Sequence, residues 1–310
     1  MTDPTDASGA DGADGAFGAG GPARPGADDA TGAPGAGGAA RPGADGATGA
    51  SGAPRLSARA AHLAYDRRTV SAGVDVDVRD GSFTVIVGPN ACGKSTLLRA
   101  FARLLKPRSG AVLLDGQDLA GLAPKQAARR IGLLPQTSTA PDGITVAELV
   151  ARGRYPHQGL FRQWTDADRA AVDDALAQTD LVDLADRDVD ELSGGQRQRV
   201  WVATALAQQT EVLLLDEPTT YLDVAHQYDL LDLFARLHAG GTTVVAVLHD
   251  LAQAARYATD LVVMRDGDVV ATGAPADVLT EELVERVFDL PCVVVPDPVT
   301  GTPLVVPRRR

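Results

Sequence analysis

The first part of the chain with a folded character shows alternating apolar and polar residues. This pattern covers 55–66 and continues through 71–88, and such alternation is typical of strands with one buried face. Directly afterwards, in 94–105, apolar residues recur at the spacing of an amphipathic helix. The pattern therefore predicts extended segments followed by a helix.

Two short apolar runs later in the chain indicate a different kind of strand. The runs in 211–218 and 242–250 are rich in Val and Leu and are bounded by charged residues, as strands buried on both faces of a parallel sheet are. Between them, 229–241 has helical spacing and ends in two glycines. A strand–helix–strand order that repeats in this way predicts a doubly wound α/β fold.

The region between these two parts has helical character. From about 137 to 200 the apolar spacing is helical and β-branched runs are few, which predicts a helical insertion. We expect the folded domain to occupy 55–290 and the last residues, 291–310, to form a C-terminal extension.

Residues 1–54 differ in composition from everything that follows. They are mostly Gly, Ala, Pro and Asp, and the segment 23–36 recurs with few changes at 40–53. Such a segment cannot bury enough apolar surface to offset the entropy lost on ordering, so we expect a disordered acidic tail. A repeat without function and a tether or spacer both remain open as interpretations.

Charge and cysteine content narrow the class of protein. The formal net charge of −12 at pH 7 disfavours a nucleic-acid partner. The two cysteines, Cys92 and Cys292, give no disulfide framework and no zinc-site spacing, which favours a reducing, cytosolic compartment. The sequence has no run of about 18 apolar residues, so a role at a membrane would be that of a peripheral subunit.

The stretch GPNACGKST, at 88–96, carries the first chemical signal. It fits the pattern GxxxxGK[ST] between a predicted strand and a predicted helix, which places backbone N–H groups and a helix N-terminus around a phosphate. We expect Lys94 to bind the β- and γ-phosphate oxygens and Ser95 to bind Mg²⁺. Cys92 is interpreted as a small residue that contributes its backbone rather than as a reactive thiolate. The predicted phosphate-binding residues are Gly88, Pro89, Asn90, Ala91, Cys92, Gly93, Lys94, Ser95 and Thr96.

Two carboxylates stand side by side at the end of the apolar run VLLLDEP, at 212–218. A buried strand that ends at Asp216 would deliver one carboxylate to Mg²⁺, and Glu217 would polarise the attacking water as general base. Because adjacent residues of a strand point to opposite faces, the chain must turn at the strand end for both carboxylates to face one site.

The sequence LSGGQ, at 192–196, is the most specific motif of the chain. A serine and two glycines open a helix, which is a second phosphate-binding arrangement, and the residues concerned are Ser193, Gly194, Gly195 and Gln196. One chain therefore carries two phosphate-binding helix ends. The two need not act on the same nucleotide within one subunit.

With these motifs established, residues 55–290 resemble the ATP-binding subunit of ABC transporters. The resemblance implies a P-loop NTPase core of the RecA-like type with an inserted α-helical subdomain. It implies that Tyr65 stacks on adenine and that Gln136 contacts Mg²⁺ and the attacking water. It also implies that Asp223 crosses a dimer interface and that His249 contacts the γ-phosphate. Ala91 departs from the glycine of many members, and a positive φ there would cost about 1 kcal/mol.

The family mechanism implied by this resemblance uses two copies of the chain, with ATP and Mg²⁺ as cofactors. Residues 193–196 of one copy would close over ATP held by 88–96 of the other, and hydrolysis would release the pair. The implied partners are a second copy, membrane-spanning permease subunits and, indirectly, an extracytoplasmic solute-binding protein. The implied location is the cytoplasmic face of the cell membrane.

Three stretches narrow the subfamily by resemblance. Residues 144–161, 217–227 and the end of the chain from 289 are similar to importers of ferric siderophores, with haem and cobalamin importers close by. In that family the cargo does not contact this subunit. A nucleotide-switched scaffold on soluble partners is the alternative function, whereas Glu217 argues against a sensor that binds ATP without hydrolysis.

Overall fold

The computed structural model describes residues 54–159, 164–220 and 222–309. The expected disordered tail, 1–54, lies outside these ranges apart from Pro54. None of the helices in the described ranges combines the length and the apolarity needed to cross a membrane.

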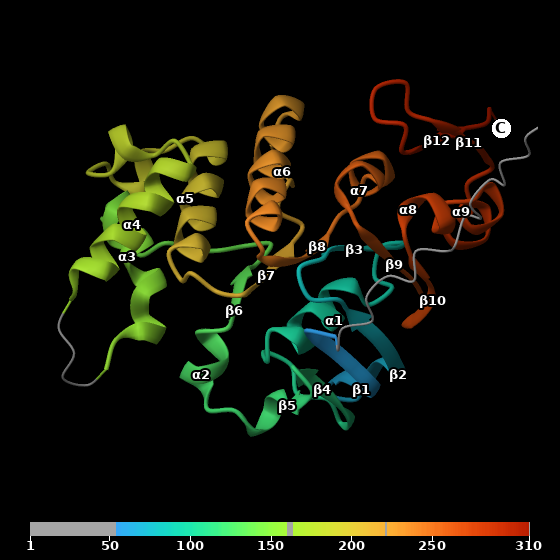
Figure 1. The fold of residues 1–310 in the computed structure, drawn as a ribbon, viewed down its shortest axis with the longest axis horizontal. Helices are drawn as coiled ribbons and strands as arrows, with labels where there is room; N and C mark the ends of the chain where they lie inside the picture. The colour runs from blue at the N-terminus through green and yellow to red at the C-terminus, as the bar shows by residue number, and fades with distance from the viewer. Residues whose placement is uncertain (1–53, 160–163, 221, 310) are drawn as a thin grey trace, which may run out of the picture. The chain divides into compact units, whose positions relative to one another are not determined.

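A six-stranded sheet forms the centre of the fold, in the order β10-β9-β3-β8-β7-β6 (Figure 1). All pairs except β9–β10 are parallel. Every residue of β3, β7 and β8 is buried, which confirms the interpretation of the Val- and Leu-rich runs as strands covered on both faces. The strands are β3 (Phe83–Val87), β6 (Ile131–Leu134), β7 (Val212–Asp216), β8 (Thr243–Val247), β9 (Asp260–Arg265) and β10 (Asp268–Gly273).

The edge strand β10 departs from the expected parallel order. It turns back on β9 through Asp266 and Gly267, whose φ angles are 52° and 91°. A two-residue turn with positive φ at both positions matches the right-handed twist of an antiparallel hairpin, and the pair Asp-Gly favours it. This local turn therefore adds an antiparallel strand to a sheet that is otherwise parallel.

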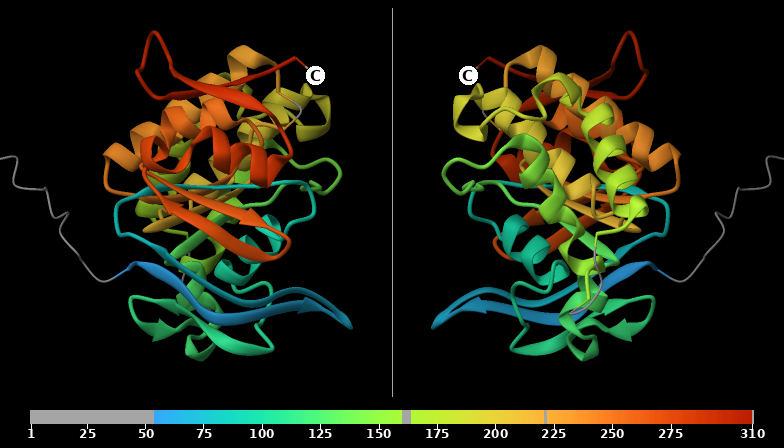
Figure 2. Two further views of the ribbon diagram at one scale, coloured as in Figure 1. Left: turned by 90° about the vertical axis from the view of Figure 1, so that its right-hand side faces the viewer. Right: turned by 90° about the vertical axis from the view of Figure 1, so that its left-hand side faces the viewer.

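A second, antiparallel sheet lies against one face of the first, in the order β2-β1-β4-β5. Figure 2 shows its strands β1 and β2 as a ribbon in a separate layer. Helix α1 packs between the layers through Leu97, Leu98 and Phe101, which share one apolar cluster with both sheets. The elements are β1 (Leu56–Tyr65), β2 (Arg68–Val78), α1 (Lys94–Phe101), β4 (Ser109–Leu114), β5 (Gln117–Asp118) and α2 (Pro124–Ala128).

Helices cover the opposite face of the six-stranded sheet. Leu231 and Phe234 of α6 are fully buried there, in a second apolar cluster that includes the β3 side chains Phe83 and Val85. A hairpin of β11 and β12 packs beside these helices within the expected C-terminal extension, whose limits 291–310 stay a prediction. The elements are α6 (Val224–Ala239), α7 (Leu251–Tyr257), α8 (Pro275–Val278), α9 (Glu281–Phe288), β11 (Cys292–Pro296) and β12 (Pro303–Pro307).

The helices between β6 and β7 form an apolar cluster of their own beside the sheet (Figure 1). A buried ion pair joins two of these segments, because Arg154 Nε lies 3.0 Å from Asp168 Oδ1. The limits 137–200 of the expected helical insertion stay a prediction. The elements are α3 (Val146–Ala151), the 3-10 turn η2 (Arg152–His157), α4 (Asp166–Gln178), the 3-10 turns η3 (Val182–Leu184) and η4 (Val189–Glu191), and α5 (Gly194–Leu206).

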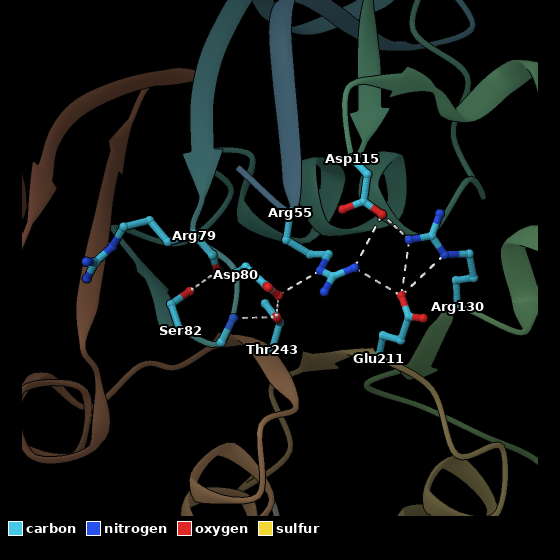
Figure 3. Close-up of polar contacts among 9 residues, drawn as sticks. Arg55, Arg79, Asp80, Ser82, Asp115, Arg130, Glu211 and Thr243 are labelled. Carbon is cyan, nitrogen blue, oxygen red and sulfur yellow. Dashed lines mark hydrogen bonds and ion pairs between the residues drawn. The ribbon is translucent and has the colours of Figure 1, made fainter. Parts of the chain in front are cut away.

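A network of charged side chains joins the two sheets (Figure 3). Arg55 lies 2.7 Å from Asp80, 3.3 Å from Asp115 and 3.1 Å from Glu211. Arg130 contacts Asp115 and Glu211 as well. These residues precede β1, β3, β6 and β7 or follow β4, so the network fastens the antiparallel sheet to the N-terminal ends of the parallel strands. Single pairs at partly exposed positions contribute little, whereas a shared network contributes more.

Candidate active site

A cavity of about 250 Å³ lies at the C-terminal end of β3, beside the N-terminus of α1. Ligands of open α/β sheets bind at this end of the strands. Its wall brings together most of the loop predicted to hold phosphate and one predicted catalytic residue. The lining residues are Tyr65, Arg68, Val70, Asn90, Ala91, Gly93, Lys94, Ser95, Thr96 and Glu217.

The loop backbone has positive φ angles at Gly88, Ala91 and Gly93. Ala91 has φ 62°, which confirms that this alanine occupies a position suited to glycine. Gly88 has φ 155°, and a Cβ there would lie 2.2 Å from the carbonyl oxygen of Met264, so no side chain fits. Gly93, with φ 108°, is the residue that caps α1. The strained loop therefore directs the first N–H groups of α1 toward the cavity.

Lys94 and Cys92 are both held inside the loop. Lys94 is 5% exposed, and its Nζ donates hydrogen bonds of 2.8 Å to the carbonyl oxygens of Gly88 and Pro89. This leaves one of three ammonium donors for a ligand. Cys92 is 4% exposed, and burial raises the pKa of its thiol, which disfavours a thiolate.

Ser95 and Asp216 are the oxygen donors best placed for Mg²⁺. The Ser95 hydroxyl donates a 2.8 Å hydrogen bond to Asp216 Oδ1, so the two oxygens already lie together. Burial raises the pKa of Asp216, while the hydrogen bond from Ser95 opposes this rise. Within the described ranges there is no group of three or more His, Cys, Asp or Glu suited to a metal. One carboxylate and one hydroxyl fit Mg²⁺, which takes its remaining ligands from phosphate and water.

The Glu217 carboxylate contacts two other predicted site residues. Its Oε2 accepts a 2.6 Å hydrogen bond from Gln136 Nε2, and its Oε1 lies 2.7 Å from His249 Nε2. Glu217 has φ 52°, a left-handed conformation that bends the chain directly after β7. This bend brings Glu217 to the cavity wall while Asp216 stays 3% exposed beside Ser95, which is the turn that the sequence required.

The helix tip of the LSGGQ motif is elsewhere in the fold. Ser193 caps α5, its Oγ accepting from Gln196 N at 3.3 Å, while Ser193 N donates to Gln196 Oε1 at 3.0 Å. Apart from its chain neighbours and the backbone of its own helix, no described atom would lie within 4 Å of a Cβ placed on Gly194. The described residues that line the phosphate cavity include none of the four tip residues. The structure therefore does not join the two phosphate-binding helix ends within one chain.

Two further predicted residues are exposed. Tyr65, 39% exposed, lines the cavity and accepts a 3.3 Å hydrogen bond from Arg99. Asp223 caps α6, with His226 N 3.0 Å from its Oδ1, and hydrogen bonds from His226 lower the pKa of this carboxyl group. Asp223 is not among the residues that line the cavity.

Arg68 and Val70, which line the cavity from β2, were not predicted from the sequence. Neither belongs to a motif. The available signal was the hairpin itself, because Arg68 pairs with Tyr65 across the β1–β2 ladder and therefore accompanies it.

The profile of the family described as "ABC transporter" matches residues 72–220. The ferric enterobactin transport ATP-binding protein of Escherichia coli K12 is 54% identical over 257 residues, which cover 83% of this chain and 95% of that protein. The chain belongs to the ABC transporter family. This ABC protein therefore binds and hydrolyses ATP, as its motifs predicted.

Two other comparisons place the ABC cassette among its relatives. The hemin import ATP-binding protein of Rhodococcus jostii RHA1 is 45% identical over 256 residues, 82% of this chain and 87% of that protein. A solved dimer of a bacterial ABC transporter cassette superposes with a TM-score of 0.64 at 26% identity, covering 71% of this chain and 98% of that one. The expected family and the P-loop fold with helices beside its sheet are thus confirmed. The roles of the individual site residues stay predictions.

Proposed function

We propose that this ABC ATPase energises the import of ferric siderophores. The support is the 54% identity to a ferric enterobactin transport protein, against 45% to a hemin import protein. In this proposal it works at the cytoplasmic face of the membrane, with permease subunits that span the bilayer. An extracytoplasmic solute-binding protein delivers the cargo to those subunits.

The hydrolytic part of the proposal rests on the two contacts that the Glu217 carboxylate makes. A carboxylate at the edge of a phosphate cavity, with one oxygen 2.6 Å from Gln136 and the other 2.7 Å from His249, is oriented to accept a proton from water. Lys94 and the N–H groups of the loop hold the β- and γ-phosphates. His249 contacts the γ-phosphate.

Mg²⁺ fits the same site beside these groups. Ser95 and Asp216 would hold the ion, and Gln136, which is bonded to Glu217, would contact it as well. When bound, Mg²⁺ would neutralise charge that develops on the phosphate oxygens. Tyr65, which faces the cavity, stacks on the adenine ring.

The homodimeric part of the proposal is supported by the exposed helix tip at 193–196. A serine hydroxyl, two glycines and a helix N-terminus form a candidate phosphate-binding surface, and none of these residues belongs to the lining of the chain's own cavity. A second copy, related by a two-fold axis, would bring its tip to this cavity and its Asp223 to the shared interface.

Mixing two inactive variants tests this arrangement. Lys94→Ala removes the phosphate-binding lysine of the loop, and Ser193→Arg replaces the serine of the tip with a bulky side chain. Each pure variant is therefore expected to lose ATP turnover. In a mixed dimer one composite site has an intact loop from one copy and an intact tip from the other. Random mixing then restores about a quarter of wild-type turnover, because half of the dimers are mixed and each has one intact site. If both groups act within one chain, the mixture stays inactive.

The cargo needs a separate experiment in cells. We expect a strain lacking this chain to lose uptake of an iron-55-labelled ferric siderophore, while uptake of haem and cobalamin continues. Loss of haem or cobalamin uptake instead would transfer the proposal to one of those cargoes. Unchanged uptake of all three compounds in that strain, together with ATP turnover by the purified protein, would favour the soluble scaffold.

A further inference from the structure

A bridge of two glutamines connects the helix behind His249 to the chain that follows Glu217. Gln253, on α7, donates a 2.7 Å hydrogen bond from Nε2 to Gln227 Oε1 on α6. Gln227 in turn donates from Nε2 to the carbonyl oxygen of Leu222, at 3.0 Å. Leu222 directly precedes Asp223, the cap of α6.

The bridge is buried at the end nearer to His249. Gln253 is 5% exposed, so its amide depends on protein partners rather than on water. Asp250, the neighbour of His249, accepts 2.7 Å and 2.9 Å hydrogen bonds from the N–H groups of Ala252 and Gln253. The first turn of α7 is thereby fixed between His249 and the bridge.

A third amide holds the same stretch of chain from the LSGGQ helix. Gln198, on α5, donates a 3.1 Å hydrogen bond to the carbonyl oxygen of Pro218, the residue after Glu217. Backbone carbonyls on both sides of Thr219 and Thr220 are thus held by side chains of two different helices. The left-handed backbone of Glu217 needs such support, because a strained conformation persists where its surroundings fix it.

The geometry points to Gln227 and Gln253 as positioning residues for ATP hydrolysis. Their bridge ties the first turn of α7, which follows His249, to Leu222, which precedes Asp223, so the γ-phosphate contact and the dimer-interface residue keep one register. Movement of either group is transmitted to the other through two hydrogen bonds. This inference rests on the proposed function, because it takes Glu217 and His249 as partners in the reaction.

Methionine substitutions test the bridge, since methionine keeps the length of glutamine but forms neither hydrogen bond. Gln227→Met and Gln253→Met in the full-length protein are each expected to lower kcat for ATP roughly three- to tenfold, the usual effect of one hydrogen bond. KM for ATP stays unchanged. The double variant is expected to be no slower than the slower single variant, because both changes cut one bridge.

Tyr257→Phe is the matched control for the packing of α6 against α7. It removes a 2.6 Å hydrogen bond from the Tyr257 hydroxyl to Asp232, which joins the same helices away from the bridge. Its kcat should equal that of the wild type. If Tyr257→Phe loses as much kcat as the methionine variants, general packing of the two helices explains the effect and the proposal is wrong. The proposal is also wrong if the loss of kcat in the double methionine variant equals the product of the two single losses.

Gln227→Glu keeps the test decisive if a methionine variant does not fold. The carboxylate still accepts from Gln253 but cannot donate to Leu222, so the expected loss of kcat matches that of Gln227→Met. Wild-type kcat in this variant overturns the proposal. Glu217→Gln is measured in parallel. Wild-type turnover in Glu217→Gln would refute the proposed function itself. Loss of turnover in Glu217→Gln, with wild-type kcat in the Gln227 and Gln253 variants, would refute only the role of the bridge.

Discussion

The phosphate-binding loop at 88–96 and the helix tip at 193–196 are both glycine-containing helix N-termini, but their surroundings differ. In the loop, Lys94 and Ser95 are bonded to Gly88, Pro89 and Asp216. At the tip, Ser193 and Gln196 are bonded only to one another among the side-chain contacts that the described residues make. The loop is therefore fixed by contacts with other segments of its own chain, whereas the polar side chains of the tip make only their local capping contacts.

The difference shows that two copies of one binding principle can serve different tasks. A helix N-terminus attracts phosphate wherever it occurs. The sheet edge around the loop adds two carboxylates, because β7 ends at Asp216 and Glu217 follows it directly. The tip stands on a helical region with its own small core, and its residues do not line the cavity. Substitutions in the loop and substitutions in the tip region should therefore affect different measured quantities.

The largest effect is expected at the loop. Lys94→Ala removes the cation that the loop buries and is expected to abolish nucleotide binding, since no other lysine lines the cavity in the described chain. Equilibrium binding of a fluorescent ATP analogue measures this loss of affinity, with Lys106→Ala as the control outside the cavity. ATP affinity equal to the wild type would contradict the interpretation of the loop.

The next largest effect is expected on ATP hydrolysis, with ATP binding retained. Glu217→Gln should lower ATP turnover by roughly 10²–10⁴, the usual contribution of a general base, while ATP stays bound. With hydrolysis blocked, the tip of each copy should remain closed over the loop of the other, and size-exclusion chromatography with ATP should show a stable dimer. Turnover at the wild-type rate would refute the assignment of Glu217.

A smaller effect is expected in the helical region that carries the tip. Hydrogen bonds from the Thr165 hydroxyl and from Arg154 lower the pKa of Asp168 from 3.8 to about 2. Asp168→Asn leaves the buried Arg154 without a counter-charge and should cost about 3 kcal/mol of unfolding free energy. Hydrogen exchange should locate the loss in 146–206, with the sheet protected. The exposed Asp166→Asn is the control, and equal protection in both variants would contradict the prediction.

The same pair predicts a dependence on pH. A carboxyl group with a lowered pKa in the folded state stabilises the protein above its unfolded pKa. That contribution is complete above about pH 4 and is lost as the pH falls toward about 2, the folded pKa of Asp168. Urea unfolding of the wild type across this window should show a decline that Asp168→Asn lacks.

The smallest effect is expected at Ala91. Glycine accepts φ 62° without strain, so Ala91→Gly should stabilise the protein by about 0.5–1 kcal/mol and leave ATP affinity unchanged. Thermal unfolding measures the change. Ala170→Gly, inside α4, is the control and should destabilise by about 1 kcal/mol. Destabilisation by Ala91→Gly would show that the side chain contributes packing to the loop.

Local sequence was sufficient for those features that a short pattern determines. The apolar run before Asp216 predicted a buried strand, and the glycines around Lys94 predicted a loop between strand and helix. The positive φ of Ala91 followed from the same motif. In each case the physical cause lies within a few residues of the observation.

Features that depend on distant partners were not predictable. The alternating pattern indicated strands in the regions of β1 and β2, yet their assembly with β4 into a separate antiparallel sheet depends on register between segments far apart. The amides of Gln198, Gln227 and Gln253 carry no local signal, because what matters is which carbonyl or amide each one meets. A glutamine on a helix is ordinarily a solvated residue.

The ion network around Arg55 sets a boundary for trimming of the chain's amino-terminal segment. The guanidinium groups of Arg55 and Arg130 share Asp115 and Glu211, and Arg55 alone also contacts Asp80. Proteolysis that stops before Arg55 leaves this balance intact. A cut one residue later would leave three carboxylates beside a single guanidinium, and their mutual repulsion would loosen the edge where the first strand enters the fold.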